Sequence, residues 1–65
     1  MWQLTVEREK RGWSKSELSR RSGVDLASLC RIELGRIYPY PGWRRKIAKA
    51  MDMPEKVLFD KVGEP

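Results

Sequence analysis

The sequence contains no histidine and one cysteine, and this shortage excludes several classes of protein. Without histidine, the chain lacks the commonest metal ligand and the usual general base of enzymes. The single thiol of Cys30 cannot form an intramolecular disulfide. Because the remaining residues form no catalytic constellation, we predict that the protein is not an enzyme. We also expect no cofactor, no metal and no small-molecule ligand.

Long apolar runs are missing as well. No run approaches the ~20 apolar residues that a membrane-spanning helix needs. Charged residues follow the apolar start at residues 1–4 too closely for a signal peptide. We therefore expect a cytoplasmic protein that does not bind a membrane, with its cysteine reduced. The length of 65 residues predicts one domain over 1–65, stabilised by tight helix packing, self-association or both.

Positive charge is plentiful and concentrated in one segment. The formal net charge is +5, from 14 basic and 9 acidic residues. Residues 31–49 hold six of the basic residues and one acid, Glu33, so this segment alone carries a net +5. Such a stripe favours a polyanionic partner, with nucleic acid ahead of an anionic membrane. A solvated basic face is the alternative interpretation.

Three glycines divide the first half of the chain into short helices. Gly12, Gly23 and Gly35 each follow a run of helix-forming residues and fit the left-handed conformation that ends a helix. The two prolines in 38–42 predict a non-helical loop there. The fold class is therefore all-α, with five helices expected at 2–11, 15–22, 26–34, 42–51 and 54–60.

Residues 15–34 have the pattern of a helix-turn-helix. Ser14 and Glu17 are spaced as a capping box at the start of the first helix, and Asp25 is a good N-cap for the second. Gly23 supplies the turn, and the second helix of such a pair can lie in the DNA major groove. An ordinary helical hairpin is the alternative. The apolar residues expected to hold the two helices on the core are Leu18, Val24, Leu29 and Ile32.

Individually weak motifs recur along nearly the whole chain. They are Arg8, Arg11–Ser14, Glu17–Arg21, Gly23–Val24, Arg31–Glu33, Gly35–Arg36, Pro39, Ile47–Ala50 and Leu58–Phe59. In this order and spacing the chain resembles the Cro/cI-type helix-turn-helix regulators, the xenobiotic-response-element (XRE) family. The resemblance implies a compact, lambda-repressor-like DNA-binding domain. It also implies a cytoplasmic, nucleoid-associated protein of a prokaryote or phage.

The same resemblance implies which residues contact double-stranded DNA. At the start of the second helix, Ser14 and Lys15 belong to a phosphate-binding helix end. The positions that face base edges are Leu26, Ala27, Ser28, Cys30 and Arg31. The positions that hold the DNA backbone are Arg36, Tyr38, Arg44 and Arg45.

Several of these assignments leave alternatives open. Arg31 is the candidate for pairing with guanine, and a phosphate contact is its alternative. Leu26 either faces a thymine methyl or belongs to the core with Leu29. We interpret Cys30 as a small neutral residue rather than as a redox switch. The aromatic pair Tyr38 and Tyr40 favours loop packing over base stacking.

Some residues depart from the family pattern. Leu34 stands where asparagine is usual, and with Leu26 and Ile37 it predicts an unusually apolar exposed face. Arg44 and Glu7 occupy positions where apolar residues are common. Asp52 replaces the glycine that often ends the fourth helix.

The resemblance finally places a structural ion pair at Arg8 and Glu33. It implies a homodimer that pairs through the last helices and represses transcription as a sequence-specific regulator. The alternative is a protein-interaction module, such as an antagonist of another regulator, that keeps the fold without base readout. If the chain is complete, we expect no ligand-sensing domain.

Overall fold

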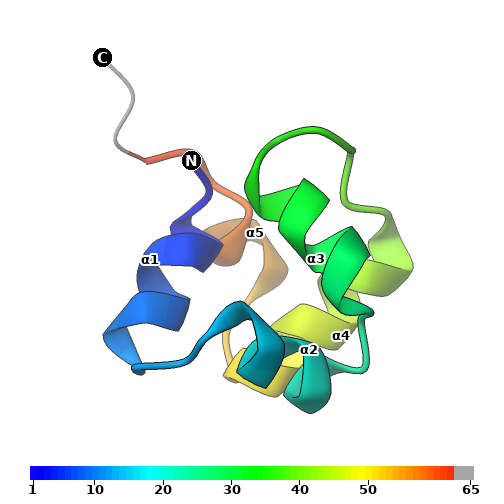
Figure 1. The fold of residues 1–65 in the computed structure, drawn as a ribbon. Helices are drawn as coiled ribbons and strands as arrows, with labels where there is room; N and C mark the ends of the chain where they lie inside the picture. The colour runs from blue at the N-terminus through cyan, green and yellow to red at the C-terminus, as the bar shows by residue number, and fades with distance from the viewer. Residues whose placement is uncertain (63–65) are drawn as a thin grey trace.

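The computed structural model describes residues 1–62, and this part of the chain forms five helices, as the sequence predicts (Figure 1). Helix α2 packs against α3 and α4, whereas α5 packs against α1 and α4. The longest helix, α4, has 11 residues, and no helix in residues 1–62 has the length and apolarity of a membrane span. The helices are α1 (Gln3–Lys10), α2 (Lys15–Ser22), α3 (Leu26–Glu33), α4 (Pro41–Met51) and α5 (Glu55–Leu58).

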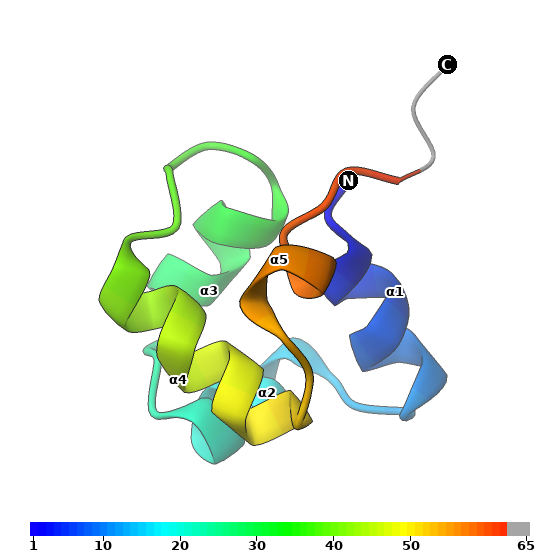
Figure 2. The same cartoon turned by 180° about the vertical axis from the view of Figure 1, so that it is seen from behind.

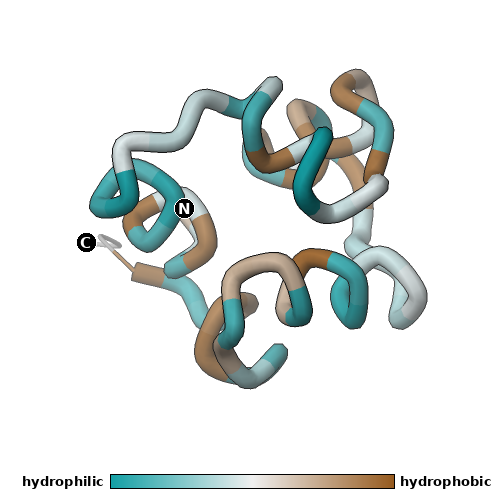
Figure 3. The backbone as a smooth tube through the Cα atoms, turned by 90° about the horizontal axis from the view of Figure 1, so that it is seen from below, coloured by the Kyte–Doolittle hydropathy of each residue, from teal (hydrophilic) through white to brown (hydrophobic). Residues whose placement is uncertain are grey.

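One core joins all five helices. Each helix contributes at least one fully buried apolar side chain, and Val24 adds another from the turn between α2 and α3. Hydrophobic and hydrophilic residues occur side by side along the helices, so that helices are not apolar or polar as a whole (Figure 3). The four core residues predicted for the helix-turn-helix are confirmed. The buried cluster consists of Leu4, Leu18, Val24, Leu29, Ile32, Ile47, Met51 and Leu58.

The turn between α2 and α3 is short because caps fix both of its sides. Gly23 ends α2 in the left-handed region with φ of 80°. The Asp25 carboxylate accepts a hydrogen bond from the Ser28 amide at 2.9 Å and so begins α3. The Ser19 hydroxyl donates to the Val24 carbonyl at 2.6 Å, which ties the turn back to α2.

The predicted capping box of α2 is half formed. The Ser14 hydroxyl accepts from the Glu17 amide at 3.1 Å, as the pattern predicts. The Glu17 carboxylate, however, accepts from the guanidinium groups of Arg20 and Arg21. Charged donors one turn along the helix compete better for a carboxylate than a neutral backbone amide does.

The predicted bounds of α1 and α3 differ from the structure by one residue at one or both ends, and those of α4 and α5 are wrong for a physical reason. Helix α4 begins at Pro41, inside the segment expected to be a loop, because the first helical position needs no N–H and suits the fixed φ of proline. Helix α5 is shorter than 54–60: Pro54 is its N-cap, and Phe59 already leaves the helical conformation.

The shortening of α5 brings the two ends of the described chain together. The Gln3 amide donates to the Asp60 carbonyl at 2.8 Å, and the Val62 amide donates to the Met1 carbonyl at 2.8 Å. Figures 1 and 2 show the first residues beside the segment that follows α5. This pairing replaces the last helical turn that the sequence predicts.

Candidate nucleic-acid interface

Helix α3 buries one face and leaves the other open. Leu29 and Ile32 are completely buried against the core. On the other side, Arg31 and Ala27 are exposed, and Leu26 is 43% exposed. Leu26 is therefore not a core residue, which removes that alternative. The other two residues predicted to face base edges, Ser28 and Cys30, are half-buried.

A buried ion pair holds the end of α3 on α1. Arg8 Nε donates to Glu33 Oε2 at 2.9 Å, and the Arg8 Nη2 group donates to Glu33 Oε1 at 3.0 Å. The two side chains are only 9% and 3% exposed. Thr5 also donates to Glu33 Oε1, at 3.1 Å. The structure thus joins the two residues for which the sequence predicts an ion pair.

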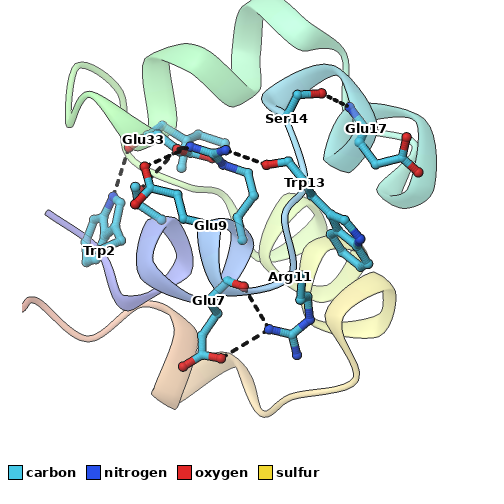
Figure 4. A network of polar contacts seen from close by, with 11 residues as sticks. Trp2, Glu7, Glu9, Arg11, Trp13, Ser14, Glu17 and Glu33 are labelled. Atoms are coloured by element: carbon cyan, nitrogen blue, oxygen red, sulfur yellow. Dashed lines mark hydrogen bonds and ion pairs between the residues drawn. The ribbon is translucent and has the colours of Figure 1, made fainter.

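The remaining donor of this arginine fixes the start of the helix-turn-helix. Arg8 Nη1 donates to the Trp13 carbonyl at 2.7 Å, immediately before Ser14 (Figure 4). One guanidinium therefore links α1, the end of α3 and the segment that leads into α2. The contacts from Thr5 and to Trp13 are absent from the sequence-based prediction, since neither follows from helical spacing.

The start of α2 presents the residues predicted to bind phosphate. Ser14 is exposed and Lys15 is half-buried. Just before them, the Trp13 ring contacts two guanidinium groups, whose central carbons lie 4.4 Å (Arg21) and 5.7 Å (Arg11) from the ring centroid. These cation–π contacts fix the segment that carries Ser14.

The residues predicted to contact the DNA backbone lie on the loop between α3 and α4 and on α4 itself. Arg36 and Tyr38 are exposed on the loop, and Arg45 is exposed on α4. Arg44 is instead partly engaged within the molecule. It donates from Nη1 to the Tyr38 hydroxyl at 3.2 Å, and its Nε lies 3.8 Å from Glu55.

The two tyrosines of this loop have different neighbours. The Tyr40 ring packs on Trp43 with centroids 5.1 Å apart, which agrees with the predicted loop packing. Tyr38 is paired with Arg44, whose guanidinium lies 5.5 Å from the ring centroid. Tyr38 and Tyr40 nevertheless remain 65% and 62% exposed.

The exposed apolar surface is smaller than the sequence predicts. Leu34 is 63% exposed, just beyond the end of α3. Ile37, expected on the same face, packs against the core instead. The chain turns at Gly35, with φ of 75°, and this turn directs the loop back toward the core. Leu26 and Leu34 therefore carry the apolar character of this surface.

Charge on this surface is almost entirely positive. The one acid of residues 31–49, Glu33, is buried and paired, so this segment has no exposed carboxylate of its own. Its cations are exposed except Arg44, which is half-buried near Glu55. The exposed acids that flank this segment in sequence are Asp25, at the start of α3, and Asp52, at the end of α4. The hydrogen bond from the Ser28 amide, helped by the positive charge of Arg31, lowers the pKa of Asp25.

Comparison with known proteins gives one informative similarity. The chain is 39% identical over 62 residues to a protein of Bacillus subtilis (strain 168) described as the HTH-type transcriptional repressor RghR. The match covers 94% of this chain and 46% of RghR, so the chain spans about half the length of that relative. No family model matches the chain, and no solved structure matches it significantly.

Proposed function

We propose that this chain is a helix-turn-helix regulator that binds double-stranded DNA in a sequence-specific manner. The observation that carries the proposal is the open face of α3, which is rigidly backed by Leu29, Ile32 and the buried Glu33. The similarity to a protein described as a helix-turn-helix repressor supports it and favours repression. In this proposal, residues 1–65 are a single Cro/cI-type domain that acts at the nucleoid.

The proposed contacts divide into base readout and phosphate binding. Helix α3 enters the major groove with Arg31 facing a guanine, while Leu26 and Ala27 face thymine methyls. The amides at the start of α2, together with Lys15, bind a phosphate on one side of the groove. The phosphate contacts from the loop and α4 are Arg36, Tyr38, Arg44 and Arg45, and Arg44 also orients Tyr38 through its hydrogen bond.

The proposal includes a homodimer that binds two half-sites. A two-fold symmetric pair places two α3 helices about one helical turn of DNA apart. Helix α5 presents Val57, which is 39% exposed, on the surface expected to pair. This contact adds apolar burial to a small domain.

A protein-interaction module is the second candidate function. It is favoured by the exposure of Leu26 and Leu34 at the two ends of α3, because exposed apolar surface can mark a protein partner. In that case α3 would contact a protein instead of base edges.

A gel shift with random-sequence duplex DNA at low salt separates the two candidates. A DNA-binding domain should retard the duplex through its phosphate contacts alone. The absence of a shift at any protein concentration would reject the DNA proposal and leave the protein-interaction module.

We expect Arg31→Ala to reduce discrimination between DNA sequences by roughly 5- to 150-fold, which corresponds to about 1–3 kcal/mol for one bidentate arginine–guanine contact. Among the predicted base-facing positions, Arg31 is the one with several hydrogen-bond donors at the end of a long side chain. Affinity should be measured on a selected site, on a single-base variant of it and on random DNA.

Arg20→Ala is the matched control, because Arg20 is an exposed arginine on α2 that pairs with Glu17. It should leave discrimination unchanged. An equal loss for Arg31→Ala on all three duplexes would instead assign Arg31 to a phosphate.

A further inference from the structure

Trp2 reaches from the start of the chain to the end of α3. Its indole Nε1–H donates to the Ile32 carbonyl at 2.9 Å, across 30 positions of sequence (Figure 4). That carbonyl also accepts from the Gly35 amide at 3.0 Å, in the turn that ends α3. The last carbonyls of a helix have no continuing helix to bond them, so a side-chain donor fixes their position.

The indole is itself held from two sides. The rings of Trp2 and Phe59 meet edge to face, with centroids 5.7 Å apart and an angle of 71° between their planes. The backbone of Trp2 pairs with Lys61, and the hydrogen bond from Gln3 to Asp60 flanks this bridge. The backbone pairing fixes the point from which the Trp2 side chain extends, and the Phe59 ring restricts rotation of the indole away from Ile32.

This contact acts on a different part of α3 from the ion pair. Arg8 grips the Glu33 side chain, which leaves the backbone some freedom to rotate about that anchor. Trp2 grips the backbone carbonyl of Ile32, the residue next to Arg31. The contact of Arg8 with the Glu33 side chain and the contact of Trp2 with the Ile32 main chain hold successive residues. Together they restrict both the position of the last turn of α3 along the helix axis and its rotation about that axis.

We propose that Trp2 is a positioning residue for DNA recognition, which sets the last turn of α3 and thereby the guanidinium of Arg31. Segment 60–62 pairs with the backbone of Trp2, so the position of this segment is linked to the position of α3. The inference rests on the proposed DNA-binding function, and it assigns no DNA contact to Trp2.

The test is Trp2→Phe, which keeps an aromatic ring against Phe59 and removes the N–H donor. Chemical synthesis of the 65-residue chain gives a closer match, with β-(3-benzothienyl)alanine at position 2, because sulfur replaces the N–H within the same ring shape. Both variants should lower discrimination between a selected site and its single-base variant by roughly twofold to tenfold, the range expected for one hydrogen bond. Binding to random DNA and its salt dependence should stay as in the unchanged chain.

Phe59→Leu is the control. It removes the ring contact with Trp2 but keeps the donor and the backbone pairing of Trp2, so it should lower the melting temperature while discrimination falls less than in Trp2→Phe. If Trp2→Phe loses no more discrimination than Phe59→Leu, Trp2 is only structural and the inference is overturned.

Amide hydrogen exchange supplies a readout that needs no DNA. In Trp2→Phe, the amides of Gly35 and Arg36, which bond to the last turn of α3, should exchange roughly threefold to tenfold faster, whereas the Leu18 amide should not. Unchanged exchange at Gly35 and Arg36 overturns the inference. If the unchanged chain shifts no duplex at all, the proposed function fails, and this exchange measurement alone then decides whether Trp2 holds α3.

Discussion

Glu33→Gln should bring the domain close to unfolding. The substitution keeps the shape of the side chain but leaves the Arg8 guanidinium buried without a counter-charge, which costs about 3–5 kcal/mol at a site this enclosed. At roughly 0.05–0.15 kcal/mol per residue, a 65-residue domain has a total stability of about 3–10 kcal/mol. Urea denaturation followed by circular dichroism measures the loss in the free energy of unfolding.

A double variant separates the charge from the packing. In Arg8→Met with Glu33→Leu, both charges are gone and no buried ion is stranded, so most of the stability lost in Glu33→Gln should return. Glu17→Gln is the control: Glu17 is paired with Arg20 and Arg21, whose side chains are 74% and 50% exposed, and its loss should cost less than about 1 kcal/mol. Equal effects of Glu33→Gln and Glu17→Gln would contradict the prediction.

The helix-turn-helix could be predicted from the sequence because its signals are local. Ser14 and Asp25 each cap a helix through the amide three residues later, and that spacing is visible in the letters. Gly23 ends α2 in the left-handed conformation that glycine adopts without strain. The core residues Leu18 and Leu29 follow the helical period, which fixes the buried face of each helix.

The features that the sequence could not predict join residues far apart in the chain. The indole of Trp2 bonds to the Ile32 carbonyl, and Arg11 Nη2 donates to the Met51 carbonyl at 2.9 Å, across 40 positions. Every residue has a backbone carbonyl that can accept a hydrogen bond. The residue type at the acceptor position therefore does not indicate that such a bond forms. The early end of α5 has the same origin, because pairing with the first residues outweighs another helical turn.

The candidate site was predictable as a face but not as a set of contacts. Helical period correctly separated Arg31 from the buried Ile32. It could not place Leu26, whose position borders the core, or Ile37, which lies in a loop without a period. The role of Arg31 depends on which DNA acceptor lies nearest when α3 docks, and that geometry belongs to the complex and not to the chain.

DNA affinity should fall steeply as salt rises. Four cations lie at the proposed phosphate contacts: Lys15, Arg36, Arg44 and Arg45. Each neutralised phosphate contributes about −0.9 to the slope of log affinity against log salt, so the slope should be about −3.6 per bound chain. Affinity for random DNA should therefore drop roughly 150-fold between about 50 and 200 mM salt. Fluorescence anisotropy across a salt series measures this slope.

The exposure of these cations predicts which of them contribute most to the salt dependence of DNA binding. Arg36 and Arg45 are exposed, whereas Arg44 already donates to Tyr38 and lies near Glu55. Arg36→Gln or Arg45→Gln should each make the slope shallower by about 0.9, with a similar loss of affinity on every duplex. Arg44→Gln should change the slope less than either, because part of its charge is already compensated within the protein.

Lys10→Gln is the charge-matched control. Lys10 lies at the end of α1, outside the proposed contacts, where it pairs with Glu7 at 3.5 Å. It removes one positive charge from the protein without removing a phosphate contact, so its slope should equal that of the unchanged chain. If Lys10→Gln and Arg36→Gln lower the slope equally, the protein attracts DNA only through its overall charge and the proposed interface is wrong. If affinity barely changes with salt, phosphate binding fails as an explanation, and the exposed Leu26 and Leu34 then favour a protein partner.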